Sequence, residues 1–155
     1  MKFLTDVNLG KLAKWLRILG YNTVYHTGNA DRNFLKKAAT EGRIVLTRKK
    51  DMERRQFSGR LVIIHSDHVE EQISEVMDKL SFSPDPERIF SICLRCNEGL
   101  VEVNREEVFC MVPNHVFLSH TEFFMCPLCK GVFWPGTHRD NVQGYLRTHI
   151  QRHRL

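Results

Sequence analysis

The sequence predicts an α/β fold: a three-layer domain in which helices cover both faces of a parallel sheet, followed by a small β-rich module and a C-terminal helix. Short β-type runs alternate with helical segments over residues 1–80, a pattern typical of parallel sheets. From residue 89 onward the β-type runs are short, and turn residues separate them. Two Cys-x-x-Cys pairs lie in this second region and indicate a module that a metal stabilises.

Four strands and three helices alternate in the first region. The strands are expected at residues 2–5, 23–25, 44–46 and 61–64. The helices between and after them carry apolar side chains at helical spacing. Gly20 and Gly42 end the first two helices, and Leu80 closes the apolar pattern of the third. The residues expected to cap the three helices are Asn8, Asp31 and either Ser66 or Asp67.

A domain boundary is expected in the stretch SFSPDPER, residues 81–88, which holds two prolines and has no apolar periodicity. We therefore predict an α/β domain over residues 1–82 and a linker over residues 83–88. The β-rich module and a basic C-terminal helix then occupy residues 89–155, with the helix itself at roughly 139–151.

The charge of the chain favours a polyanionic partner, since its 155 residues carry a formal net charge of +5 and its pI is near 9.1. Cations exceed acids by 15 to 10 over residues 1–80 and by 5 to 1 over residues 130–155. The longest apolar runs are far shorter than the roughly 20 residues that cross a bilayer, and no signal-peptide pattern opens the chain. We therefore expect a soluble protein without membrane contact, in the cytoplasm or another reducing compartment.

The cysteines of the second region are expected to bind zinc. An odd number of clustered cysteines in a reducing compartment favours a metal over disulfides. Two knuckle turns that face each other bring four thiolates to a closed tetrahedral site, although redox pairs and uncoordinated core thiols are alternatives. Cys110 is expected in the core, and His138 is not needed as a fifth ligand. The predicted zinc ligands are Cys93, Cys96, Cys126 and Cys129.

A carboxylate follows each predicted strand of the first region. Asp6 ends the first strand, Asp31 lies after the second, Asp51 follows the third and Asp67 follows the fourth. Because the carboxyl ends of parallel strands meet at one edge, where α/β folds bind ligands, we expect these side chains to gather there. Such a cluster suits Mg²⁺ or Mn²⁺, which activates water at a phosphodiester. The alternative for Asp31 and Asp67 is an ordinary role as helix caps.

Basic residues near the same edge are candidates to hold a nucleic-acid backbone. Those on the first helix fit a solvated helix face equally well. Trp15 falls within the apolar stripe of that helix, and we expect it in the core rather than in a base-stacking role. The basic residues are Lys11, Lys14, Arg17, Arg48, Lys49 and Lys50.

The chain resembles one known family over nearly its whole length, the Mut-seven C-terminal RNase domain. The resemblance rests on FLTDVNLGKLAKWLRILGYNTVY, DRNFLKKAATEGRIVLTR, EEQI at residues 70–73, and the stretches CLRC, CPLC and VFWPGTH, in this order. It implies that the α/β domain is PIN-like, that it cleaves RNA with metal-bound carboxylates, and that the cysteine module is a structural zinc ribbon. On this resemblance Asp6 and Asp31 are ligands of magnesium or manganese.

The third motif, LTRKKD at residues 46–51, departs from the family pattern. Members of the family usually read LTRD followed by a basic residue, and Lys49 therefore stands where an aspartate is expected. A lysine has three donors and no acceptor and cannot ligate a hard metal ion. Either Asp51 supplies the carboxylate, or metal binding is weakened and Lys49 pairs with Asp6 or with a substrate phosphate.

The leading prediction is a metal-dependent endoribonuclease that hydrolyses RNA phosphodiester bonds with the catalytic carboxylates Asp6, Asp31 and Asp51. The RNA contacts expected with them are Arg48, Lys49, Lys11 and Arg17. The second prediction is a non-catalytic RNA-binding module with a degenerate active site. Lys49 favours it, as do the basic C-terminal residues Arg147, His149, Arg152, His153 and Arg154. A third possibility is that the ribbon docks onto a ribosome or another RNA-processing complex, which only the acidic region 98–107 supports.

Overall fold

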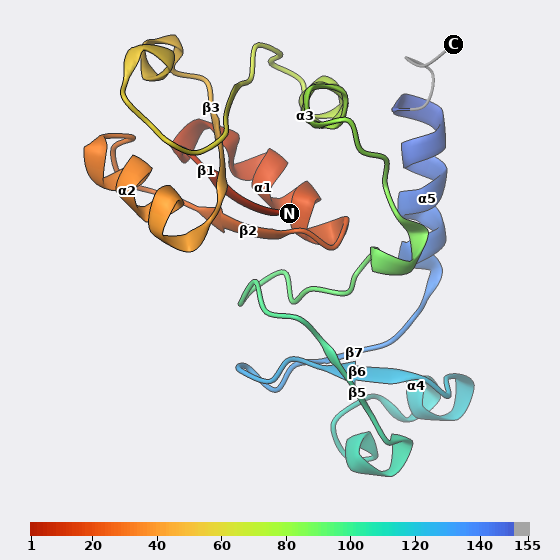
Figure 1. Ribbon diagram of the computed structural model, residues 1–155. Coiled ribbons are helices and arrows are strands. Elements are labelled where there is room, and N and C mark those ends of the chain that lie inside the picture. The colour runs from red at the N-terminus through yellow and green to blue at the C-terminus, as the bar shows by residue number, and fades with distance from the viewer. Residues whose placement is uncertain (151–155) are drawn as a thin grey trace.

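Four parallel strands form the centre of the first half of the chain in the computed structural model, which describes residues 1–150 (Figure 1). Their order is β2-β1-β3-β4, and β2 and β4 are therefore the edge strands. Thr5 pairs with Tyr25 on one side and with Leu46 on the other, which brings the carboxyl ends of three strands into line. The strands are β1 (Lys2–Thr5), β2 (Asn22–Tyr25), β3 (Ile44–Thr47) and β4 (Leu61–Ile63).

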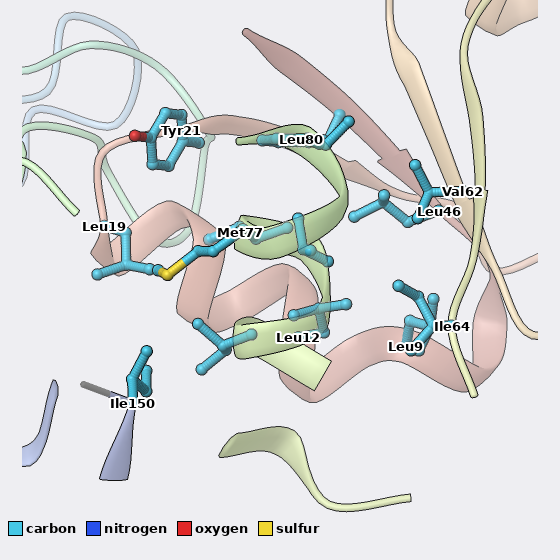
Figure 2. Packing of buried hydrophobic residues seen from close by; sticks show 14 of the residues in the cluster. Leu9, Leu12, Leu19, Tyr21, Leu46, Val62, Ile64, Met77, Leu80 and Ile150 are labelled. Atoms are coloured by element: carbon cyan, nitrogen blue, oxygen red, sulfur yellow. The ribbon is translucent and has the colours of Figure 1, made fainter. Parts of the chain in front are cut away.

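Helices cover both faces of this sheet, with α1 (Gly10–Ile18) and α3 (Val69–Leu80) on one face and α2 (Arg32–Glu41) on the other. Successive residues of a strand point to opposite faces. Phe3 therefore joins the hydrophobic cluster beneath α1 and α3, while Leu4 joins the cluster beneath α2. Figure 2 shows side chains from α1, α3 and the strands meeting in the larger cluster. The predicted α/β fold with its parallel sheet is confirmed.

The first helix begins at a different cap from the predicted one. Asp6, rather than Asn8, caps the single 3₁₀ turn η1 (Val7–Leu9) that leads into α1, because its carboxylate accepts the backbone N–H of Asn8 at 2.9 Å. The second helix follows the prediction, since Asp31 caps α2 and Gly42 ends it with a left-handed φ of 61°.

The third helix also starts without the predicted cap. α3 begins after His68, which makes no capping hydrogen bond, and the cap predicted at Ser66 or Asp67 is therefore wrong. Both side chains have other partners. The hydroxyl of Ser66 donates to Glu75, and the carboxylate of Asp67 pairs with Arg48.

An antiparallel sheet of order β5-β6-β7 forms the centre of the second half of the chain. It packs against η4 (Arg105–Val108) and α4 (Asn114–Ser119). Cys110 lies outside this small core and is exposed, so its predicted core position is wrong. The strands are β5 (Val101–Val103), β6 (Phe123–Met125) and β7 (Val132–Phe133).

The C-terminal helix α5 (Thr137–His149) returns to the first half of the chain. Leu146 and Ile150 are buried in the larger cluster with residues of α1 and α3. The basic residues Arg152, His153 and Arg154 lie outside the described residues. Neither α5 nor any other helix within residues 1–150 is long and apolar enough to cross a membrane.

Aromatic and polar contacts fix α5 in place. The rings of Trp15 and Tyr145 stack with their centroids 4.8 Å apart, so that Trp15 packs against the core as predicted. The hydroxyl of Tyr145 donates to the carboxylate of Glu70 in α3. Burial and this hydrogen bond raise the pKa of Tyr145 to about 12. Helix α5 is thereby tied to both helices on this face.

The linker packs against the end of α1. Gly20 has a φ of 82°, and a Cβ atom there would lie 2.2 Å from the carbonyl oxygen of Arg88, so that only glycine permits this approach. Arg88, at the end of η3 (Pro86–Arg88), donates to the carbonyl of Gly20 at 2.8 Å and lies over the ring of Tyr21. These contacts hold the linker against the first region, and the domain division at residues 83–88 stays a prediction.

Candidate functional site

The four cysteines predicted as zinc ligands converge from two knuckle turns. The carbonyls of Cys93 and Cys126 accept backbone N–H groups four residues further on, from Asn97 at 2.8 Å and from Lys130 at 3.0 Å. Asn97 and Lys130 both have a left-handed φ, 60° and 59°, which turns the chain back on itself. The two turns are thus built alike. They hold the ligand atoms within 4.8 Å of one another in the group Cys93, Cys96, Cys126 and Cys129.

This donor set fits a metal ion, because four thiolates make a closed tetrahedral zinc site. As thiols, Cys96 and Cys126 differ in pKa. The backbone N–H of Cys129 lowers the pKa of Cys126 to about 7, whereas hydrogen bonding to the Cys129 side chain raises the pKa of Cys96 to about 12. Within residues 1–150, neither Cys110 nor His138 belongs to the group. The four cysteines are placed to bind a metal, consistent with structural zinc.

Arg17 holds the first knuckle against α1 and β2. Its guanidinium donates to the carbonyl of Thr23 at 2.9 Å and to the carbonyl of Leu94 at 2.8 Å. Burial lowers the pKa of Arg17, and the negative charge of Cys93 and Cys96 opposes this shift. The guanidinium is thus used inside the protein, and the predicted contact of Arg17 with RNA stays untested.

Asn97 covers the open side of the edge strand β2. Its side-chain oxygen accepts the backbone N–H of Thr23 at 2.7 Å, and its amide nitrogen donates to the side chain of Asn22 at 3.0 Å. An edge strand exposes unpaired backbone groups that invite pairing with another chain. The knuckle therefore satisfies a backbone N–H group of the edge strand as well as holding two of the cysteines.

Asp6 lies wholly buried at the carboxyl end of β1, and three donors hold its carboxylate. Oδ1 accepts the backbone N–H of Asn8, while Oδ2 accepts the hydroxyl of Thr47 at 2.5 Å and the backbone N–H of Arg48 at 3.1 Å. Asp6 thus fastens the loop after β3 to the end of β1. Thr47 was not predicted as a site residue. Its signal is a hydroxyl at the end of the third strand, within the third motif.

Asp31 and Asp51 are the exposed carboxylates of the predicted site. Oδ1 of Asp31 accepts the backbone N–H groups of Asn33 at 2.9 Å and Phe34 at 3.1 Å. The side chain of Asp51 is 63% exposed and lies 3.5 Å from Arg55. Within residues 1–150, only the cysteines form a group of three or more possible ligands within reach of one ion. The carboxylates do not form such a group, and their roles as catalytic residues and metal ligands stay predictions.

The basic residues that are predicted to contact RNA lie in different surroundings. Arg48 forms an ion pair with Asp67, and Lys11 is exposed on α1. Lys49 is half-buried, and its backbone N–H donates to the hydroxyl oxygen of Thr47 at 3.1 Å. Its ammonium group has no hydrogen bond or ion pair with any residue in the described range, the predicted partner Asp6 included.

Glu75 of α3 fixes the loop that follows β4. Its carboxylate accepts the backbone N–H groups of His65 at 3.0 Å and Ser66 at 3.2 Å, and the ammonium of Lys79 at 2.7 Å. Burial raises the pKa of Glu75, but the hydrogen bonds outweigh burial and hold the pKa at about 2, below its ordinary value of 4.5. The same loop carries Asp67.

Replacing Glu75 by glutamine is expected to lower the free energy of unfolding by about 1 kcal/mol at neutral pH, because charged hydrogen bonds are lost. The folded-state pKa of about 2 lies below 4.5, so the contribution is complete above about pH 4.5 and fades as the pH falls toward 2. Urea unfolding near pH 7 and near pH 3 measures this, and the difference between wild type and variant should shrink at the lower pH. The exposed Glu71→Gln is the control, and a difference that does not depend on pH contradicts the prediction.

A comparison with protein families agrees with these features. The family model described as the Mut7-C RNAse domain matches residues 1–146, which include the parallel sheet, the cysteine group and most of α5. No curated protein and no solved structure matches the chain. The chain therefore belongs to the Mut7-C RNAse domain family, which indicates a ribonuclease-type function with RNA as the substrate.

Proposed function

We propose that the protein is a metal-dependent endoribonuclease that hydrolyses RNA phosphodiester bonds at the carboxyl edge of its parallel sheet. The carrying observation is that the chain belongs to this RNase family and has an aspartate in each of the segments that follow β1, β2 and β3. The catalytic carboxylates in this proposal are Asp31 and Asp51, and Asp6 is a positioning residue. The thiolates of the ribbon need a reducing compartment, and we place the protein in the cytoplasm or another such compartment.

The carboxylates fit magnesium or manganese in their chemistry, since both ions prefer oxygen ligands. Asp31 and Asp51 present exposed oxygens, whereas Asp6 is buried and already accepts three hydrogen bonds. We therefore give Asp31 and Asp51 the direct contact with an ion. A bound ion of this kind activates water and stabilises the charge that develops on the phosphate.

The other side chains of the edge position the RNA. Asp6 holds Thr47 and the backbone of Arg48, and thereby sets where the 48–51 loop leaves the sheet. The ammonium of Lys49, which has no partner within the described residues, is available to a phosphate oxygen.

The test is cleavage of labelled single-stranded RNA by the full-length protein, with and without added Mg²⁺ or Mn²⁺. Asp31→Asn and Asp51→Asn are each expected to lower the cleavage rate by about a hundredfold, since each replaces a charged carboxylate ligand by a neutral amide near the reacting phosphate. Glu71→Gln, which removes an exposed carboxylate elsewhere, should cleave like wild type. Equal rates for wild type and both asparagine variants would refute the assignment.

A second candidate is an RNA-binding module without catalysis, which acts within an RNA-processing or ribosomal assembly. The observations that favour it are the lysine at position 49 and the lack, within residues 1–150, of three carboxylates within reach of one ion. If it holds, wild type binds RNA in a salt-sensitive way without cleaving it. Lys49→Asp restores the family motif and separates the candidates, because only a degenerate site gains metal-dependent cleavage from this change.

A further inference from the structure

A groove runs along the outer side of α2, on the face of the sheet away from the C-terminal helix α5. Two segments that are distant in the sequence form it: one side of α2, and the stretch that follows the 3₁₀ turn η2 (Lys50–Arg54). Its cavity volume is about 650 Å³. The lining residues from α2 are Arg32, Leu35, Lys36 and Ala39, and those from the second segment are Arg55, Gln56, Phe57 and Ser58.

The charged side chains that line the groove are all cationic. Arg32 and Lys36 are exposed and form no hydrogen bond or ion pair with any residue of the described part of the chain. Arg55 pairs with Asp51 at 3.5 Å, but both side chains are exposed, at 41% and 63%, and such a pair contributes little. Three cationic side chains and no acidic side chain therefore line the groove.

The uncharged lining suits a sugar and a base. Phe57 is half-buried, and its ring packs against the hydrophobic cluster beneath α2 while it also lines the groove. A Cβ atom at Gly59 would lie 2.4 Å from the ring of Phe57, so the glycine lets the chain pass close to this ring. Gln56 and Ser58 add neutral hydrogen-bonding groups.

The groove starts at the proposed active edge. Arg32 follows Asp31 directly at the first turn of α2, and Lys36 lies one turn further along, about 6 Å along the helix axis. On the other wall Arg55 is the ion-pair partner of Asp51. Both exposed carboxylates of the proposed site thus adjoin cations of the groove.

We infer that this groove binds the sugar-phosphate backbone of single-stranded RNA and leads the strand to Asp31 and Asp51. The inference rests on the proposed function for the direction of the strand, but not for the binding itself. It places the RNA along α2 instead of along α1, where the sequence predicts Lys11 and Arg17 as contacts. Arg32, Lys36 and Arg55 bind phosphates, and Phe57 packs against a sugar or base.

The test compares two triple variants of the full-length protein that lose the same charge. R32Q/K36Q/R55Q removes the cations of the groove. K2Q/K37Q/R60Q removes exposed cations elsewhere: Lys2 and Arg60 at the amino ends of strands, and Lys37 on α2 outside the groove lining. Fluorescence anisotropy then measures binding of a short labelled single-stranded RNA at several KCl concentrations, without added Mg²⁺ or Mn²⁺.

The groove variant is expected to bind at least tenfold more weakly at low salt than the control variant. Its slope of log affinity against log salt should fall by about 2, because each phosphate contact on a single strand contributes about 0.7. F57A should weaken binding without changing this slope. Equal affinities and slopes for the two triple variants overturn the inference, and so does a wild type that binds no RNA at low salt.

The outcomes separate this inference from the proposed function. If wild type cleaves RNA and the two triple variants bind alike, the groove is refuted and the ribonuclease proposal stands. If the groove variant alone loses binding and wild type shows no metal-dependent cleavage, the groove stands and the ribonuclease proposal fails.

Discussion

Cys126→Ser is expected to abolish stoichiometric metal binding and to unfold the ribbon. Cys126 is a buried member of the four-cysteine group, and a tetrahedral zinc site does not tolerate the loss of a ligand. Metal binding contributes on the order of 10 kcal/mol to the folding of small zinc modules. The hydrophobic core of the ribbon is small, with Val108, Val116 and Phe123 as its buried members, and cannot replace that contribution.

Unfolding of the ribbon should also destabilise β2, the edge strand of the parallel sheet. Arg17 and Thr23 meet Leu94 and Asn97 of the first knuckle, so an unfolded ribbon uncovers β2. Metal analysis of the purified protein and hydrogen exchange at the Thr23 amide measure the two effects. Cys110→Ser is the matched control, because this exposed thiol is not a ligand. Full metal content in Cys126→Ser, or equal loss in Cys110→Ser, argues against the zinc site.

Asp6→Ala is expected to lower the free energy of unfolding by about 3 kcal/mol. The change leaves the buried hydroxyl of Thr47 and the part-buried backbone N–H groups of Asn8 and Arg48 without their acceptor. Asp31→Ala also removes a carboxylate that accepts two N–H groups, but Asp31 is exposed and water replaces it. We expect a loss of about 1 kcal/mol there.

Urea unfolding of the two alanine variants measures this difference, and equal losses would show that Asp6 has no special role in the fold. The result also decides how activity data are interpreted. A loss of cleavage in a variant of Asp6 can arise because the 48–51 loop moves, whereas Asp31 and Asp51 are exposed and report on the site itself. Their asparagine variants are therefore the sharper test of the ribonuclease proposal.

Local signals in the sequence predicted the helix starts only where no distant residue competes. Asp31 caps α2 as predicted, because its partners lie two and three residues further on. Ser66 was a reasonable cap by the same rule, yet Glu75 binds its hydroxyl and its backbone N–H. Asp67 is likewise drawn to Arg48. Tertiary partners override a local preference when they satisfy the same polar group.

The order of apolar segments along the chain was enough to predict the parallel sheet with helices on both faces, since alternating apolar segments have few other ways to bury themselves. The spacing of the cysteines likewise predicted the four-cysteine group, because a pair of residues three apart fixes two ligands within one turn. Three features became visible only in the folded chain: Asp6 is buried against Thr47, Arg17 binds the ribbon, and Arg32 and Arg55 line one groove. Each depends on contacts between residues far apart in the chain, which the spacing of residue types does not specify.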